Sequence, residues 1–266
     1  MAMLTRLAGL IFAALLLTTL HQPIAAAPRI TPIVGGGFLL GGSVNGKWID
    51  AATTARQLRG NQRYRIYTTA GQIGTSTGKA KAVEVICPDM WQVEFKPYPS
   101  AAEFVAVGGT HNPLPRKPRL HSPNTAVYRQ AVADILRAHG IANPDVRITK
   151  IVRIDLEGDG VDEVVISATR FSSQLPSASA GDYSLVVLRK IINGKVQTIP
   201  IDENYYPKAE DFIAPNTFSV PAIVDANGDG TMEIMVNWGY YEGSGAELYS
   251  VQGSKVTGVL SGGCGV

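Results

Sequence analysis

Acidic residues recur with the same spacing in two short segments, 155–163 and 225–233. In both, side-chain oxygens stand at positions 1, 3, 5 and 9 and glycine stands at position 6. Ca²⁺ takes about six to eight oxygen ligands, so alternate residues of a sharply turning loop can surround it. Glycine permits the turn because it adopts positive φ readily. The spacing predicts two calcium sites. The expected side-chain ligands are Asp155, Glu157, Asp159 and Glu163 in the first, and Asp225, Asn227, Asp229 and Glu233 in the second.

These segments differ from an EF-hand loop, which needs a bidentate glutamate at position 12 and a helix on each side. Position 12 is Ile166 in the first segment and Val236 in the second, and neither side chain binds a hard cation. Short runs of β-branched residues flank both segments, which is typical of buried strands. The motif is therefore a calcium loop between two strands.

The two loops resemble the FG-GAP/VCBS type of repeat, in which Asp-x-Asp/Asn-x-Asp-Gly-x-x-Asp/Glu joins two strands of an integrin-like β-propeller blade. The resemblance covers about residues 150–260 and implies the ligands given above, with the backbone carbonyls of Val161 and Thr231 in addition. Glu157 departs from the family pattern because its side chain is longer than Asp or Asn. Two repeats do not make a propeller, which needs at least about four blades. The alternative is a pair of acidic β-turns without metal, since Asp, Asn and Gly also favour turns.

The rest of the chain predicts a mainly β fold with two short helices. We expect a small β-rich domain at 30–108 with one helix, in which 71–78 is a polar turn and 82–87 a strand. A Pro-rich linker at 109–124 follows. The region 125–266 then contains a second helix and two four-stranded repeats resembling propeller blades, at about 148–202 and 218–262. Asn193-Gly194 and Gly253-Ser254 are the expected hairpin turns of these repeats. Two such sheets can pack face to face.

The N-terminus and the cysteines indicate export. Residues 1–26 read as a secretory signal peptide, with Arg6 before an apolar run and small residues at 24–26. No later segment is long enough for a transmembrane helix, so we expect a secreted or periplasmic protein, with an uncleaved anchor as the alternative. An oxidising compartment favours a disulfide between Cys87 and Cys264, the two cysteines of the chain. Two unpaired thiols are the alternative.

Several function classes lack support. A net charge of +2 without a long basic run argues against nucleic-acid binding. Ser76 lies in a Gly-x-Ser-x-Gly pattern, but no strand-to-helix turn is predicted around it, as a nucleophile elbow requires. The histidines show no zinc-binding spacing. Glycoside hydrolysis needs two free carboxylates in a cleft, and the dense carboxylates belong to the calcium loops. No catalytic residue is predicted.

Aromatic residues beside glycines supply the remaining signal. Trp238, Tyr240 and Tyr241 follow the second calcium loop and suit either a ligand platform for sugars or peptides or the edge of a core. We expect a non-enzymatic, calcium-binding β-rich binding or adhesion module whose partner is a protein or carbohydrate at the cell surface. The alternatives are a secreted hydrolase with structural calcium and an unrecognised active site, and a structural protein of the cell envelope.

Overall fold

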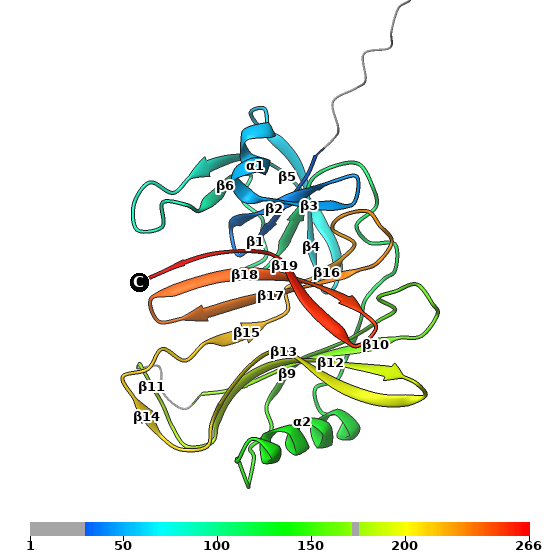
Figure 1. Ribbon diagram of the computed structural model, residues 1–266, viewed down its shortest axis with the longest axis vertical. Coiled ribbons are helices and arrows are strands. Elements are labelled where there is room, and N and C mark those ends of the chain that lie inside the picture. Colours follow the sequence, from blue (N-terminus) through cyan, green and yellow to red (C-terminus); the bar gives the residue numbers. More distant parts are fainter. Residues whose placement is uncertain (1–29, 172–175) are drawn as a thin grey trace, which may run out of the picture.

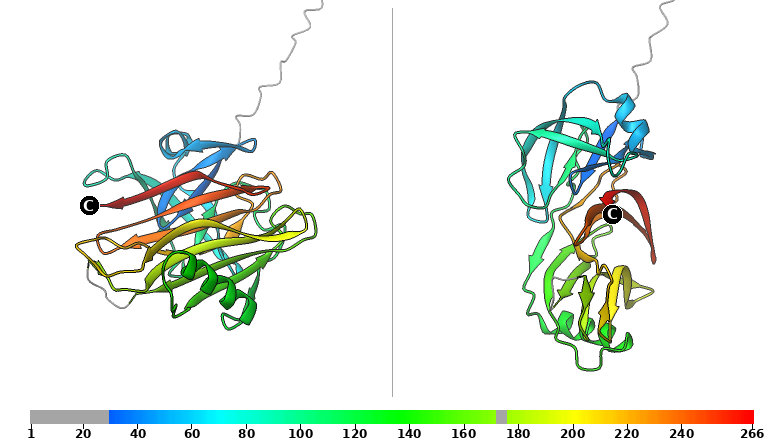
Figure 2. Two further views of the ribbon diagram at one scale, coloured as in Figure 1. Left: turned by 60° about the horizontal axis from the view of Figure 1, so that its bottom comes forward. Right: turned by 90° about the vertical axis from the view of Figure 1, so that its left-hand side faces the viewer.

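Four layers are stacked along the long axis of the molecule in the computed structural model, which describes residues 30–171 and 176–266 (Figure 1). An N-terminal barrel lies at one end and helix α2 at the other, with two antiparallel sheets between them (Figure 2). The predicted signal peptide at 1–26 lies outside the described residues. Among the residues that are described, none of the helices has the length and apolar character needed to cross a membrane.

The barrel is a sheet of seven strands in the order β1-β7-β4-β5-β6-β2-β3, which closes because β1 also pairs with β2. Alternating side chains from its strands fill the interior, including Tyr64, Ile66 and Val93. Asp50 caps helix α1 by accepting a hydrogen bond from the Thr53 amide at 2.7 Å. The elements are β1 (Thr31–Gly35), β2 (Phe38–Val44), β3 (Lys47–Asp50), α1 (Ala51–Gln57), β4 (Gln62–Thr68), β5 (Gly71–Ala82), β6 (Trp91–Lys96) and β7 (Val105–Val107).

The first-repeat sheet has the strand order β13-β12-β10-β9-β8. Helix α2 covers one face, where Val132 and Leu136 pack on Ile151 and Ile166. A separate two-stranded sheet pairs β11 (Ser177–Ala178), which precedes β12, with β14 (Glu210–Asp211), which follows β13. The elements of the layer are β8 (Arg119–His121), α2 (Ala126–Ala138), β9 (Ile148–Ile154), β10 (Glu163–Arg170), β12 (Asp182–Ile192) and β13 (Lys195–Tyr206).

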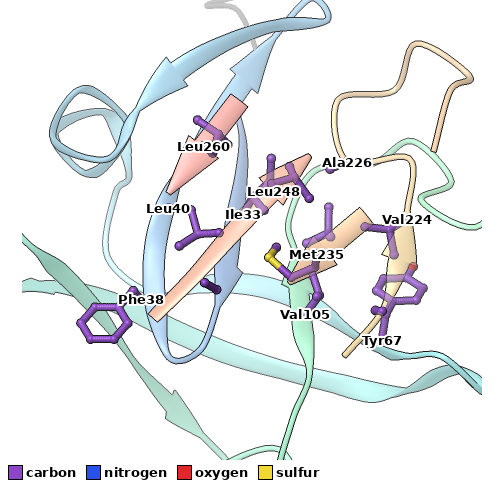
Figure 3. Packing of buried hydrophobic residues seen from close by; sticks show 13 residues of the cluster. Ile33, Phe38, Leu40, Tyr67, Val105, Val224, Ala226, Met235, Leu248 and Leu260 are labelled. Atoms are coloured by element: carbon purple, nitrogen blue, oxygen red, sulfur yellow. The ribbon is translucent and has the colours of Figure 1, made fainter. Parts of the chain in front are cut away.

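The second-repeat sheet is buried on both faces. Its Ile234 and Val236 pack against the first-repeat sheet. Its Met235 and Leu248 face the barrel, where Figure 3 shows them beside Ile33 of β1. Burial of both faces explains why Glu233 is followed in β17 by a continuous apolar run instead of an alternating pattern. The strands are β15 (Thr217–Ser219), β16 (Ile223–Val224), β17 (Glu233–Tyr240), β18 (Gly243–Gln252) and β19 (Lys255–Gly265).

The mainly β prediction is confirmed, and so are the hairpins at 193–194 and 253–254, which join β12 to β13 and β18 to β19. The first-repeat sheet has five strands because β8 joins its edge, and in the other sheet β15 and β16 share one edge of β17. The blade-like character of the repeats stays a prediction. The predicted turn at 71–78 is wrong: these residues form part of β5, which pairs with β4 and β6. The expected strand at 82–87 is also wrong, because β5 ends at Ala82.

The disulfide between Cys87 and Cys264 is confirmed, with a Cα–Cα distance of 5.7 Å. Cys87 lies in the connection between β5 and β6 of the barrel, and Cys264 lies near the end of β19. The bond therefore joins the barrel to the last strand of the second-repeat sheet.

The Pro-rich segment 109–124 packs against the barrel and both sheets. Arg65 of the barrel donates to the His111 carbonyl at 2.5 Å, and the Pro113 carbonyl accepts from the Asp225 amide at 2.8 Å. Strand β8 extends the first-repeat sheet. The segment is thus ordered by contacts to each of the layers it passes.

Candidate calcium loops and an aromatic cleft

The two acidic loops occupy equivalent places, one between β9 and β10 and the other between β16 and β17. They touch each other, because the Met232 amide donates to the Leu156 carbonyl at 2.9 Å. Arg116 joins them by donating to the carbonyls of Asp155 at 2.5 Å, Leu156 at 2.8 Å and Gly230 at 2.6 Å. The sequence motif is therefore part of a two-loop unit that also needs a residue of the Pro-rich segment.

Backbone amides orient the acids of the second loop. Asp225 accepts from Gly228 at 2.7 Å and from Gly230 at 3.0 Å, and Asp229 accepts from Thr231 at 2.8 Å. The tight turn needs Gly230, whose φ is +92°. Each carboxylate keeps lone pairs beyond these bonds, so the amides orient the acids without using all of their acceptor capacity.

Neighbouring elements enclose the start of the second loop. The His111 ring lies 2.9 Å from the Asp225 carbonyl through Nε2, and Asn227 donates to the Gly46 carbonyl of the β2–β3 turn at 3.3 Å. Asp225 and Asn227 are buried, whereas Asp229 is exposed. Solvent therefore reaches the loop from the Asp229 side.

Glu233 closes the second loop with an uncompensated carboxylate. Its Oε2 accepts from the Ala226 amide at 2.9 Å, but its Oε1 is buried with no hydrogen-bond partner within 30–171 and 176–266. The side chain is 1% exposed. Burial raises the pKa of Glu233 to about 9, with a further contribution from the negative charges of Asp229 and Asp225. A cation in the loop would remove this electrostatic cost.

The first loop has the same backbone frame. Asp155 accepts from Gly158 at 2.6 Å and from Gly160 at 3.0 Å, and Glu163 accepts from the Leu156 amide at 2.9 Å. Burial tends to raise the pKa of Asp155, but the backbone amides and Arg116 together lower it. The anionic form of Asp155 is thus stabilised by the loop itself.

The first loop also contains a lysine from another strand. Lys190 of β12 is 6% exposed, and its Nζ lies 2.5 Å from Glu157 Oε2 and 3.6 Å from Glu163 Oε1. Burial raises the pKa of Glu163, while the Leu156 amide and Lys190 act in the opposite direction. Two of the predicted metal ligands are therefore already paired with a cation.

The described residues contain no group of three or more His, Cys, Asp or Glu side chains placed together as metal ligands. In the second loop, a hydrogen bond of 2.9 Å from Asn227 Nδ2 to Asp229 Oδ2 would have to give way to an ion. The chemistry of this loop nevertheless suits Ca²⁺, since it offers three carboxylates and an amide, and one of the carboxylate oxygens, Glu233 Oε1, has no partner among the described residues. The carbonyls of Val161 and Thr231 remain predicted ligands.

Trp238 and Tyr240 lie on strand β17, with Tyr241 in the turn that follows. Trp238 faces glycines in the neighbouring strands: an added Cβ would lie 2.5 Å from its ring at Gly245 and 2.4 Å at Gly263. Tyr240 lies over another glycine pair, Gly243 and Gly265, in the same way. The two rings are within 8° of parallel, with centroids 6.2 Å apart. The absence of side chains at these glycines lets both rings lie flat on the sheet.

A cleft of about 360 Å³ opens beside Trp238, at the junction of the barrel and the second-repeat sheet. Glu103 lies in it and accepts hydrogen bonds from Ser219 and from Asn237 Nδ2, the latter at 3.5 Å. Asn237 Oδ1 has no partner among the described residues. The lining includes Tyr98, Glu103, Phe218, Ser219, Asn237 and Trp238.

Sequence reasoning missed Arg116, Lys190 and Glu103. Arg116 belongs to the basic group at 116–119, which gives no indication that it bridges two distant loops. Lys190 lies near the end of the mostly apolar strand β12, and a lysine within such a strand is the local signal that the sequence offers. Nothing near Glu103 in the sequence marks it as part of a cleft.

Comparison with known proteins gives no match: no family model, no curated protein and no solved structure matches this chain. The resemblance to FG-GAP/VCBS repeats therefore depends on the two loops alone.

Proposed function

We propose that this protein is an extracytoplasmic, calcium-stabilised binding module that takes a carbohydrate on the rings of Trp238 and Tyr240. The observation that carries the proposal is the pair of near-parallel rings, Trp238 and Tyr240, laid flat over glycines of β18 and β19. Sugar rings present C–H groups on their faces and hydroxyls at their edges. Flat aromatic faces suit the first, and the hydroxyl of the adjoining Tyr241 suits the second. Asn237 and Glu103 line the cleft on the opposite face of β17, because successive side chains of a strand alternate between its faces.

Calcium has a structural role in this proposal. Asp225, Asn227, Asp229 and Glu233 would hold the ion, and the ion would supply the positive charge that the buried Glu233 lacks. Strand β17 begins at Glu233 and contains Trp238 five residues later, about 16 Å away in extended chain. The ion therefore does not reach the ligand. It fixes the start of the strand that presents the rings.

The lining of the cleft favours binding over catalysis. Glycoside hydrolysis uses two carboxyl groups separated by about 5–9.5 Å, whereas Glu103 is the single acidic residue among the described residues that line the cleft. Glu103 is also engaged by Ser219 and Asn237. A hydrolase and a structural envelope protein are the competing functions, and the binding experiment below separates them.

Export to the periplasm or the cell exterior fits this function. The disulfide is compatible with an oxidising compartment, and weak extracellular calcium sites work where calcium is abundant. N-terminal sequencing of the exported protein should begin at Ala27 or nearby. Recovery of only the full-length protein from the cytosol would contradict export.

The binding function is tested with purified protein on an array of cell-surface and cell-wall carbohydrates in millimolar calcium. We expect binding to one class of polysaccharide, weakened about tenfold or more in W238A and Y240A because each removes an aromatic face. Y128A is the matched control, since Tyr128 belongs to α2 at the other end of the molecule. Absence of binding to every carbohydrate, or equal binding by W238A, would contradict the proposal. Cleavage of the bound carbohydrate that is lost in E103Q would favour the hydrolase instead.

A further inference from the structure

The two loops present the same glutamate in different electrostatic surroundings. Glu163 and Glu233 each accept one amide hydrogen bond of 2.9 Å through Oε2. The other oxygen differs: Glu163 Oε1 lies 3.6 Å from Lys190 Nζ, whereas Glu233 Oε1 has no partner in the part of the chain that the structure describes. The molecule thus contains one loop with a built-in cation and one without.

The contact between Lys190 and the first loop is an interaction of charges. The ammonium lies between Glu157 and Glu163, which are positions 3 and 9 of the loop. Neither contact has hydrogen-bond geometry, so electrostatic attraction is what joins them. Lys190 is 6% exposed and Glu163 is 2% exposed. At such burial an unpaired charge is costly, and each group compensates the other.

Strand register identifies the equivalent position in the second repeat. Val164 of β10 faces Arg189 of β12, so one further step along the pair brings Glu163 opposite Lys190. In the second repeat Ile234 of β17 faces Tyr249 of β18, and the same step brings Glu233 opposite Ser250. The residue that supplies the ammonium in the first repeat is therefore matched by an uncharged serine in the second.

We propose that the Lys190 ammonium takes the place of a metal ion in the first loop, so that this protein binds one calcium ion, at the second loop. The inference rests on the proposed calcium site at the second loop and changes the expectation of two sites to one. A calcium ion beside the ammonium would meet like-charge repulsion and would find two of its carboxylates engaged. Glu157, the departure from the family pattern, has the length to reach the ammonium at 2.5 Å.

A reciprocal exchange of the two strand residues tests this. The variants are K190S and S250K, each made in the full chain, stripped with a chelator and titrated with calcium by calorimetry. We expect one ion per chain for the wild type, two for K190S and none for S250K. D229N should abolish binding by the wild type, and D159N should leave it unchanged. The matched control is K195S, because Lys195 is exposed at the start of β13.

The outcomes separate the two proposals. Two ions in the wild type, a folded K190S that still binds as the wild type does, or an S250K that keeps its calcium would each overturn the role of Lys190. In another outcome the wild type binds no calcium and K190S binds one ion. This result would contradict the proposed site at the second loop and support the role of Lys190.

Thermal unfolding gives a second readout that does not depend on stoichiometry. In chelator, K190S should melt below the wild type because Glu157 and Glu163 lose their counter-charge, and about 10 mM calcium should restore its melting temperature. S250K should melt at the same temperature with and without calcium. If K190S does not fold under either condition, S250K decides: loss of calcium binding by folded S250K supports the proposal, and retention overturns it.

Discussion

Asp202 illustrates how a single buried acid affects the stability of this fold. It lies on β13 and bonds to the Tyr249 hydroxyl, and burial raises its pKa to about 6 despite that bond. Tyr249 is itself 8% exposed. Because the folded state binds this proton more tightly than the unfolded state, the contribution of Asp202 to the free energy of unfolding falls as the pH rises from about 4 to about 6.

We therefore predict that D202N stabilises the protein above pH 6. The gain at pH 7 is at most about 3 kcal/mol, reduced because the side chain is only partly buried. Near pH 4 the folded wild type still holds the proton, so the buried negative charge has not formed and the variant should gain little there. Urea unfolding at the two pH values measures the effect. A gain at pH 4 equal to that at pH 7 would rule out titration of Asp202 as its cause.

The spacing of acidic residues and glycine along the two loops predicted the loop turns but not the residues that other strands bring to them. Alternate acids with glycine at position 6 were sufficient to predict the turns, and Gly160 and Gly230 have the positive φ that the turns need. Spacing could not reveal Lys190, since it lies 27 residues beyond Glu163 and reaches it only through the pairing of β10 with β12. The flat setting of Trp238 was hidden for the same reason, because it depends on glycines in two neighbouring strands.

Among the elements, the Pro-rich segment has the greatest influence on the arrangement of the loops. Its Arg116 donates to three carbonyls in two loops. The planar guanidinium has several donors in a fixed geometry, which a lysine ammonium does not reproduce. Prolines and basic residues in the sequence indicate exposure, so the composition of 109–124 predicted a linker and concealed its contacts.

We predict that R116A lowers the free energy of unfolding by about 2–4 kcal/mol, because three carbonyls at the loop junction lose a charged donor. R116K should recover part of this loss. Urea denaturation measures both variants, with R63A as the control at an exposed arginine of the barrel. A change below about 0.5 kcal/mol in R116A would show that water replaces the guanidinium without cost.

For the sheets, periodicity and turn residues predicted more than they did for the barrel. Buried runs around each loop and the turns at 193–194 and 253–254 predicted the strands beside the loops and the hairpins β12–β13 and β18–β19. In the barrel, the polar sequence of 71–78 forms the first part of β5, where Gly78 leaves room for the neighbouring Tyr64 and Val93. Pairing on both sides and close packing at a glycine override the local turn preference of such residues.

Across the whole molecule, the disulfide connects the barrel to the sheet that carries the aromatic rings. Cys264 lies between Gly263 and Gly265 on β19, which are two of the glycines beneath Trp238 and Tyr240. The bond closes a loop with a sequence separation of 177 residues. In the chain-entropy description such a loop corresponds to about 5 kcal/mol, and observed values are commonly about 2–4 kcal/mol.

Replacing both cysteines should therefore have two effects of different origin. The double variant C87A/C264A should lose about 2–5 kcal/mol of the free energy of unfolding, since its unfolded chain is less restricted. Its affinity for carbohydrate should also fall, because the end of β19 is no longer fixed to the barrel and the surface under the rings becomes less rigid. Its calcium stoichiometry should equal that of the wild type, since the second loop is held by Arg116, Pro113 and His111. Denaturation, carbohydrate titration and calcium calorimetry on the same preparation measure these effects separately. If the variant is destabilised but its carbohydrate affinity is unchanged, the glycine contacts alone fix the rings.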